Sequence, residues 1–371
     1  MKSLNIGYSF FGFLGDRHIK DGKEISTPDG NATYSYTIIH ELQKRGNIVY
    51  SMMPDRDKEG VSLFGKYHFG AFSQNIRWNA YNNLRNIYSK HEMILPSLDI
   101  LLLEWRFPIP GRNVDVDKNG PNYQPDFDMQ TDLLNYYKRI RDTKIIILDL
   151  DHKLTEYDEL QWEPNAIFET SLYPETKYKL RTPVYIPTIV DELLQFKTKE
   201  PDNNKELVYI GSRYERDEII DEYIKPYAEL KKNKVYFYGN WRDYPEKLKE
   251  AEERWPGIVF NNRIGSADFH KTYKDAYVVP LLGKKSYFNS GFVTARMFES
   301  VLFGSLPVGF SKHVGIEKLA LKVVDGYEGL INFVDELKST PILRDIYRKE
   351  QVSMLRPMDV KNFVDKMIEV L

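Results

Sequence analysis

An arginine and a glutamate lie three positions apart in the segment Tyr287–Gly309, YFNSGFVTARMFESVLFGSLPVG. A helix that begins near Gly291 would place Arg296 and Glu299 on one face, because residues i and i+3 are neighbours on a helix. The guanidinium could pair with two phosphate oxygens, and the carboxylate could accept hydrogen bonds from ribose hydroxyls. The pair is therefore a candidate nucleotide site, and the alternative is an ordinary ion pair on an exposed helix face.

The elements that must position this pair alternate between apolar runs and amphipathic stretches, which is the pattern of a parallel sheet covered by helices. A small-residue break at Gly304-Ser305 separates the helix from a buried strand and favours the nucleotide interpretation. The strands predicted in this half are Leu207–Ile210, Lys234–Tyr238, Ile258–Asn261, Tyr277–Leu282 and Leu306–Gly309. The helices predicted between and after them are Glu215–Leu230, Tyr244–Arg254, Ala267–Lys274, Gly291–Phe303 and Met358–Leu371.

The first half shows the same alternation, and a polar segment, Lys197–Lys205, separates it from the second as an interdomain linker. Predicted strands are Leu4–Ser9, Ile48–Met52, Leu98–Leu103, Lys144–Leu150, Ala166–Glu169 and Val184–Pro187, with helices at Asn31–Arg45, ended by Gly46, and Gln130–Arg141. We expect two Rossmann-like α/β domains that face each other across a cleft. They span residues 1–195 and 206–355, and a C-terminal helix in residues 356–371 crosses back to the first. Ligands of such sheets bind beyond the carboxyl ends of the strands.

Composition excludes several classes of protein. The 52 basic and 54 acidic side chains give a net charge of −2, whereas a protein that binds DNA mainly by charge should be basic. Any contact with nucleic acid must therefore be local and depend on shape. The absence of cysteine excludes disulfides and thiolate metal sites. With no apolar run of about 18 residues and no signal peptide, we expect a soluble monomer in the cytoplasm.

The second half resembles the bacteriophage DNA β-glucosyltransferases, as an ordered series of short matches. This resemblance implies a GT-B fold and transfer of glucose from UDP-glucose to 5-hydroxymethylpyrimidines in DNA. It also implies that Arg296 binds the donor phosphate and Glu299 the donor ribose. The matching segments are Val208–Glu218, Val235–Asp243, Gly283–Glu299 and the stretch ending near Arg348, with weaker matches at Thr27–Gly46 and Lys144–Lys153.

By the same resemblance, the strand-to-helix turn at Gly211-Ser212 approaches the donor diphosphate, where small residues and helix N-terminal amides are suited to anions. Arg213 and Arg216 would neutralise the diphosphate as UDP leaves. The turn is about two residues shorter than the family's, so which arginine has which role is open. The alternative for both is a solvated helix start among acidic neighbours.

Asp151 is the candidate general base. It follows the predicted strand Lys144–Leu150, where a cleft residue should project, and it matches the family's catalytic aspartate. Inverting transfer needs a carboxylate beside the acceptor hydroxyl to take its proton. Asp149 is the alternative if the register differs, and a helix cap or turn is the alternative role for Asp151. The spacing of these two aspartates also keeps Mg²⁺ or Mn²⁺ possible without requiring either.

The candidate acceptor surface lies between Gly60 and His91, a stretch without Asp or Glu. Basic residues alternate there with aromatics and amides, as in a nucleic-acid groove. The alternative is an amphipathic helix that buries its aromatic residues in the first domain. For chemistry on the hydroxymethyl group, the enzyme would rotate the base out of the duplex. The candidate DNA-binding residues are Arg77, Trp78, Arg85 and Lys90.

Two other functions stay open from the sequence. One is a glycosyltransferase of the same fold whose acceptor is a polysaccharide, a protein or a small molecule, and the near-neutral charge favours it. The other is a non-catalytic protein that binds a sugar nucleotide, since architecture alone does not identify an enzyme.

Overall fold

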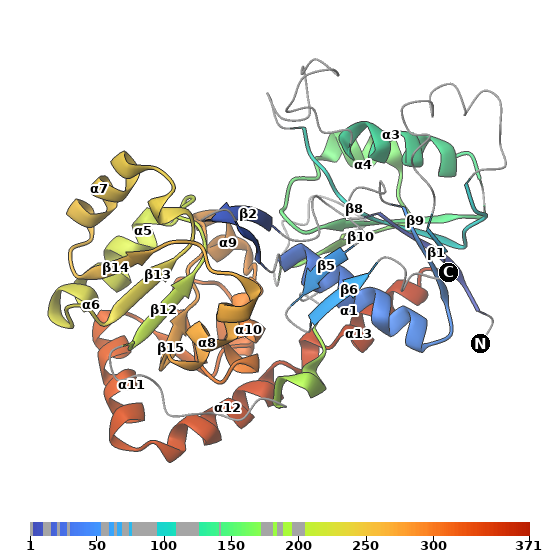
Figure 1. The fold of residues 1–371 in the computed structure, drawn as a ribbon. Helices are drawn as coiled ribbons and strands as arrows, with labels where there is room; N and C mark the ends of the chain where they lie inside the picture. The colour runs from blue at the N-terminus through green and yellow to red at the C-terminus, as the bar shows by residue number, and fades with distance from the viewer. Residues whose placement is uncertain are drawn as a thin grey trace.

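The computed structural model contains two parallel β-sheets, each with helices on both faces (Figure 1). This arrangement confirms the predicted α/β class with two parallel-sheet domains. The described residues are 3–9, 16–20, 23–27, 30–52, 59–62, 65–68, 74–75, 95–108, 126–140, 142–171, 181–183, 188–194 and 205–371.

The first sheet has seven parallel strands. Their spatial order is β11 (Arg181–Pro183), β10 (Ala166–Glu169), β9 (Lys144–Asp149), β8 (Ile100–Glu104), β1 (Asn5–Ser9), β4 (Ile48–Ser51) and β7 (Gln74–Asn75). The strands β8 and β9 are nearly continuous apolar runs because helices cover both faces of the sheet. Those helices are α1 (Gly30–Lys44) and α13 (Val360–Ile368) on one face, and α3 (Asp126–Tyr137) and α4 (Glu156–Trp162) on the other.

The second sheet has six parallel strands, in the order β14 (Ile258–Asn261), β13 (Val235–Tyr238), β12 (Leu207–Ile210), β15 (Val278–Pro280), β16 (Leu306–Phe310) and β17 (Lys322–Val324). The chain runs outward from β12 to β14 and then returns to β15. The strand order therefore reverses between β12 and β15, and a crevice for ligands forms at such a switch point. The helices are α5 (Asp217–Ile219), α6 (Lys225–Leu230), α7 (Pro245–Arg254), α8 (Ser266–Lys274), α9 (Lys285–Ser290), α10 (Arg296–Leu302), α11 (Tyr327–Ser339) and α12 (Ile342–Met354).

Two predicted helices differ from the observed ones. The helix predicted from Gly291 is wrong at its start: Gly291 has φ 69° and ends α9, and α10 begins only at Arg296. Glycine adopts this left-handed conformation without steric cost, which makes it a common helix terminator. The long helix predicted at Glu215–Leu230 contains a π turn, η4 (Ile220–Ile224), between α5 and α6. Pro226 follows this turn and lacks an N–H, which accounts for the local change in hydrogen bonding.

The two domains are joined at two adjacent crossings. A 3₁₀ turn, η3 (Val190–Leu194), packs into the second domain's core, whereas the last helix, α13, packs on the first sheet beside α1 (Figure 1). Between them, Thr188 pairs with Asp359 in a parallel bridge. Arg348 on α12 donates to Val301 O at 2.7 Å and to Leu193 O at 2.5 Å, and so links the end of α10 to η3.

Short hairpins add to the predicted elements. The pair β2 (Asp16–Lys20) and β3 (Lys23–Thr27) extends from the first half of the chain, and β3 contacts α8 of the second domain. The pair β5 (Glu59–Ser62) and β6 (Gly65–His68) is a second hairpin. Most of the predicted linker and the predicted strand Val184–Pro187 lie outside the described residues.

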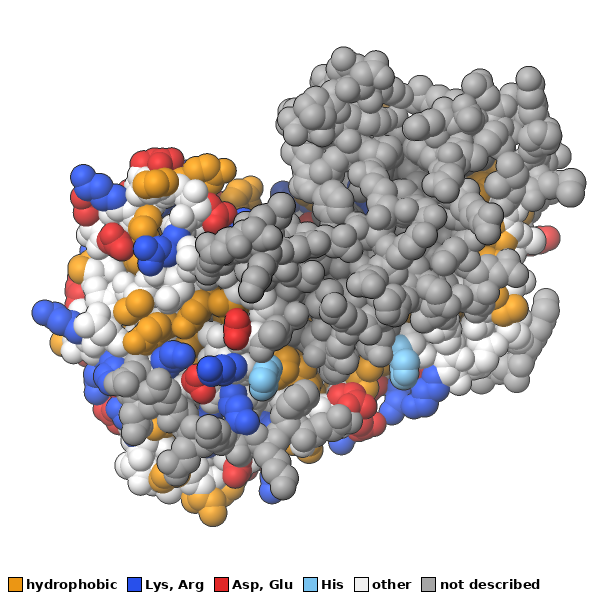
Figure 2. Space-filling model, viewed as in Figure 1, with side chains coloured by type: hydrophobic (Ala, Val, Ile, Leu, Met, Phe, Trp, Pro, Cys, Tyr) orange, Lys and Arg blue, Asp and Glu red, His pale blue; other side chains and the backbone are white. Residues whose placement is uncertain are grey.

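Charges of both signs are interspersed over the described part of the second domain's face in Figure 2, as the net charge of −2 leads one to expect. Within the ranges described above, no helix combines the length and the apolar character that a membrane crossing requires.

Candidate functional site

The turn after β12 lies at the switch point of the second sheet. Gly211 N–H donates to Tyr238 O at 2.8 Å, which joins the turn to β13. A Cβ atom on Gly211 would overlap the guanidinium of Arg296 and lie 2.6 Å from the Tyr209 hydroxyl. A larger residue here would displace the ends of these two side chains, whereas glycine lets the backbone and a cation approach each other closely.

Arg296 is fixed in direction by its neighbours. As the first residue of α10, it donates from Nε to Ile210 O at 2.7 Å and from Nη1 to Thr294 Oγ1 at 3.3 Å. Its guanidinium carbon lies 4.7 Å from the centre of the Tyr209 ring, in the range of a cation–π contact. These contacts hold the guanidinium at the carboxyl end of β12.

Arg216 is buried in the same region, with 7% of its surface exposed. Its Nη1 donates to Tyr214 O at 2.5 Å and lies 3.5 Å from Ser212 Oγ, and its Nε has no partner among the described residues. Burial lowers the pKa of Arg216, and the charge of Arg296 lowers it further, against opposing effects of nearby tyrosines and Glu215. Arginine nevertheless stays protonated in proteins, so two guanidinium charges are held close together.

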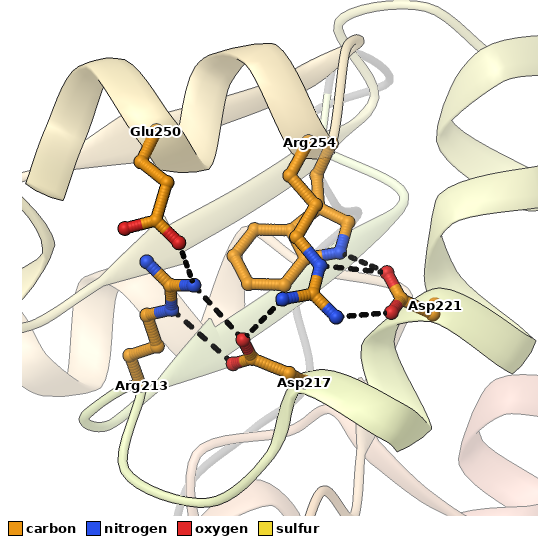
Figure 3. A network of polar contacts seen from close by, with 6 residues as sticks. Arg213, Asp217, Asp221, Glu250 and Arg254 are labelled. Carbon is orange, nitrogen blue, oxygen red and sulfur yellow. Dashed lines mark hydrogen bonds and ion pairs between the residues drawn. The ribbon is translucent and has the colours of Figure 1, made fainter.

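Arg213 has different surroundings, although it is only three residues earlier. Figure 3 shows its guanidinium between Asp217 and Glu250, at 2.8 Å and 2.7 Å from their carboxylate oxygens, and Arg254 joins the same network through Asp217. Its carbon Cζ also lies 4.9 Å from the centre of the Trp255 ring. The hydrogen bonds to both carboxylates raise the pKa of Arg213. The structure therefore brings Arg216 beside Arg296 and leaves Arg213 in a separate ion-pair network.

Glu299 lies one turn further along α10 and is 8% exposed. Its carboxylate accepts a hydrogen bond of 2.9 Å from the Tyr273 hydroxyl of α8. Burial raises the pKa of Tyr273, and the negative charge of Glu299 raises it further, so the tyrosine stays a hydrogen-bond donor. This bond orients the carboxylate within the cluster that also holds Arg296.

The two aspartates after β9 have different roles. Asp149 is 1% exposed, and its carboxylate accepts hydrogen bonds from Lys153 N at 2.9 Å and Leu154 N at 3.0 Å. These bonds stabilise the loop that follows β9. Asp151 is partly exposed and lies 3.4 Å from the hydroxyl of Tyr287, a residue of α9 in the second domain. Of the two, Asp151 is the carboxylate that meets the opposite domain.

Tyr287 interacts with the predicted base and with the two predicted donor-site arginines. Burial raises its pKa, the charge of Asp151 raises it further, and the charges of Arg216 and Arg296 act in the opposite sense. The Tyr287 hydroxyl thus lies within electrostatic reach of all three groups. The predicted base therefore contacts Tyr287 directly, and the charges of the two predicted donor-site arginines act on the same hydroxyl.

Lys284 adds a third cation that the sequence interpretation missed. Its Nζ lies 3.9 Å from Glu215 Oε2 and 4.4 Å from the centre of the Tyr214 ring. Burial lowers the pKa of Lys284, attraction to Glu215 and Asp151 opposes this effect, and repulsion from Arg216 adds to it. Lys284 stands two residues after Leu282, the last residue of the apolar run that contains β15, and a basic residue just beyond a buried strand is the signal that could identify it.

A cluster of cations of this kind is suited to a phosphorylated ligand. Two guanidinium groups and an ammonium group meet at the carboxyl end of the sheet, and guanidinium groups bind phosphate oxygens in pairs. No group of three or more His, Asp or Glu side chains suited to a metal ion occurs among the described residues. Backbone amides engage the Asp149 carboxylate, whereas the Asp151 carboxylate contacts Tyr287.

The predicted DNA-binding residues lie outside the described part of the chain, so the structure neither assembles nor separates them. They are Arg77, Trp78, Arg85 and Lys90.

The domains also touch through backbone and rings near Asp151. Ser171, just after β10, pairs with Phe292 in an antiparallel bridge. The ring of Phe292 lies 4.1 Å from that of Tyr287 and 5.2 Å from that of His152. The loop that carries Asp151 therefore packs directly on the turn that leads to Arg296.

The sequence matches no protein-family model and no curated protein sequence. Solved structures similar to this one include an alpha-glucosyltransferase in complex with UDP and a 13-mer DNA containing an HMU base, with 11% identity, a TM-score of 0.57 and coverage of 100% of this chain and 99% of that one. T4 phage beta-glucosyltransferase with UDP-glucose has 15% identity, a TM-score of 0.58 and 99% coverage of both chains. Sucrose-phosphate synthase from Thermosynechococcus elongatus has 12% identity and a TM-score of 0.58, over 99% of this chain and 98% of that one. At these identities the likeness establishes the fold, which is that of two-domain GT-B glycosyltransferases.

Proposed function

We propose that this protein is a glycosyltransferase that moves glucose from UDP-glucose to the hydroxyl of a 5-hydroxymethylpyrimidine in DNA, with inversion at the anomeric carbon. The observation that carries the proposal is the contact of Asp151 with the Tyr287 hydroxyl across two domains of a GT-B fold, where the charges of Arg216 and Arg296 also act on that hydroxyl. Similar folds occur in enzymes crystallised with UDP, with UDP-glucose and with DNA.

The donor would lie at the switch point of the second sheet. Its diphosphate would bind between Arg216 and Arg296, over the Gly211 turn, where a Cβ atom would displace the guanidinium of Arg296. Its ribose hydroxyls would donate to the carboxylate of Glu299, which Tyr273 orients. The sugar would then extend toward the first domain and Asp151.

Transfer then needs one proton movement and one displacement. The acceptor oxygen attacks the anomeric carbon as Asp151 takes the hydroxyl proton. The bond between that carbon and the diphosphate oxygen breaks, and the electron pair leaves with UDP. Arg216, Arg296 and Lys284 stabilise the negative charge that grows on the leaving diphosphate. Attack opposite to the departing bond inverts the configuration of the sugar. None of these steps requires a metal ion.

The second candidate is a GT-B transferase with another acceptor, such as a polysaccharide, a protein or a small molecule. The net charge of −2 and the mixed charges in Figure 2 favour it, since DNA-binding surfaces are strongly basic. A non-catalytic sugar-nucleotide binder is the third candidate, and it would bind UDP-glucose but release no UDP.

One screen separates the three candidates. Radiolabelled UDP-glucose and other UDP-sugars are incubated with duplexes that contain 5-hydroxymethylcytosine, 5-hydroxymethyluracil or only unmodified bases. Label in hydroxymethylated DNA alone supports the proposal. UDP release without DNA labelling in the presence of another acceptor would support the second candidate. Binding of UDP-glucose with no UDP release under any condition would contradict catalysis.

A further inference from the structure

The residue after Asp151 has an unusual backbone. His152 has φ 54°, in the left-handed region of backbone conformation that residues other than glycine rarely adopt. This conformation reverses the chain between Asp151 and Lys153, so that Lys153 N can donate to Asp149. A strained residue persists only where its surroundings hold it in place.

The contact that holds His152 is a buried carboxylate. Its Nδ1 contacts Glu169 Oε1, and Glu169, at the end of β10, is 1% exposed. Ser171 Oγ donates to the same oxygen at 3.3 Å. Glu169 is also the register partner of Asp149 across β9 and β10. The imidazole therefore ties the Asp151 loop to the neighbouring strand of the first sheet, and a buried carboxylate needs such partners.

The other side of the imidazole faces the second domain. The His152 ring packs edge-on against Phe292 at 5.2 Å and lies 6.4 Å from Tyr287, the residue whose hydroxyl contacts Asp151. Its Nε2 is buried and has no partner among the described residues. An imidazole nitrogen enclosed in this way is not exposed to an acceptor hydroxyl, so His152 is not placed to act as the base itself.

We propose that His152 and Glu169 are positioning residues, which hold the Asp151 carboxylate against Tyr287 and toward the cations of the donor domain. The proposal rests on the proposed role of Asp151 as general base. Glu169 fixes the ring, the ring fixes the left-handed turn, and the turn sets the direction of the aspartate side chain. A displacement of about 1 Å at a reacting group can lower a rate by about 10²-fold.

Three substitutions at one position separate the hydrogen bond from the backbone conformation. Asparagine keeps an N–H donor near the place of Nδ1 and tolerates the left-handed region. Glycine tolerates the conformation without the donor, and alanine lacks both. We expect turnover to fall about 10²-fold in His152→Ala and about tenfold or more in His152→Gly, and His152→Asn to recover most of this loss. The dissociation constant for UDP should stay within about twofold in all three, because the donor contacts lie in the other domain.

Crystal structures of the same variants show where the Asp151 side chain lies, and this test does not depend on measuring activity. In His152→Asn, the contact between Asp151 and the Tyr287 hydroxyl, 3.4 Å in the parent, should persist, and in His152→Ala it should be lost. If the parent protein transfers no sugar but Asp151 loses its contact with Tyr287 in His152→Ala, the proposed function is refuted and the positioning role is kept. An unmoved Asp151 with full turnover in His152→Ala would overturn the positioning role, and so would a fall in UDP affinity that parallels turnover.

Discussion

Replacing Arg296 by alanine should weaken UDP binding strongly while the fold persists. Nε of Arg296 donates to Ile210 O and Nη1 to Thr294 Oγ1, and a diphosphate bound beside the Gly211 turn would meet the Nη groups. A hydrogen bond to a charged group contributes about 1.5–3 kcal/mol, and a two-pronged contact that also loses its bond to Thr294 should contribute about 3 kcal/mol in net terms. That corresponds to a roughly 150-fold increase in the dissociation constant.

Isothermal titration calorimetry with UDP measures this change directly. Arg213→Ala is the matched control, because it removes the same side chain three residues from Arg216 but from the network of Asp217 and Glu250. We expect its UDP affinity to stay within about threefold and its free energy of unfolding to fall by about 1 kcal/mol or less, as for partly exposed ion pairs. Arg296→Lys keeps the charge without the fork and should fall between the two.

Two results would refute the reasoning. The first is a dissociation constant for UDP that does not change in Arg296→Ala. The second is an equal loss of affinity in Arg213→Ala and Arg296→Ala, which would mean that the ion-pair network takes part in binding the nucleotide. Circular dichroism spectra like the parent's ensure that either result reports on binding.

Three further predictions follow from the same geometry. Asp151→Asn should lower kcat by about 10²–10⁴-fold with UDP affinity unchanged, as isothermal titration and a steady-state UDP-release assay can check; equal kcat would remove Asp151 from the mechanism. Gly211→Ala should weaken UDP binding by about tenfold or more, since its methyl group would displace the guanidinium of Arg296; unchanged affinity in the same titration would show that the turn has room. Burial lowers the pKa of His313 from 6.5 to about 4, so the unfolded chain binds more protons in that range and the free energy of unfolding falls as the pH falls through it. Between pH 7 and pH 4, urea denaturation should show that the free energy of unfolding falls by about 3 kcal/mol less in His313→Leu than in the parent. An equal fall of the free energy of unfolding with pH in both proteins would contradict this prediction.

The sheets could be predicted because parallel strands buried on both faces leave short apolar runs in the sequence. Runs such as IIIL in β9 and LVYI in β12 were placed to within a residue or two. Gly46, predicted as a helix stop, has φ 82° and follows α1 closely. The hairpins and the break between α9 and α10 were missed, because periodicity does not distinguish one interrupted helix from a continuous one.

Some residues of the site could be predicted from local sequence features, and others depend on contacts between distant parts of the chain. Gly211 and Arg296 follow strand and helix boundaries, which are local features. The distinction between Arg213 and Arg216 depends on Glu250, a residue 37 positions from Arg213, so the spacing along the helix start could not decide it. His152 stands beside Asp151 in the sequence, but its partner Glu169 has no local signal that separates it from any other acidic residue at the end of a strand.

The contrast between Arg213 and Arg216 carries a thermodynamic consequence. Arg213 is paired with two carboxylates, whereas Arg216 is more buried, has no carboxylate partner within ion-pair distance among the described residues, and is repelled by Arg296. A buried charge without a counter-charge costs several kcal/mol, which the fold must offset elsewhere. A diphosphate placed between these guanidinium groups removes the repulsion as well as forming new bonds. The second domain should therefore gain more stability from UDP than from uridine, since only UDP carries the anion that would relieve the repulsion between Arg216 and Arg296.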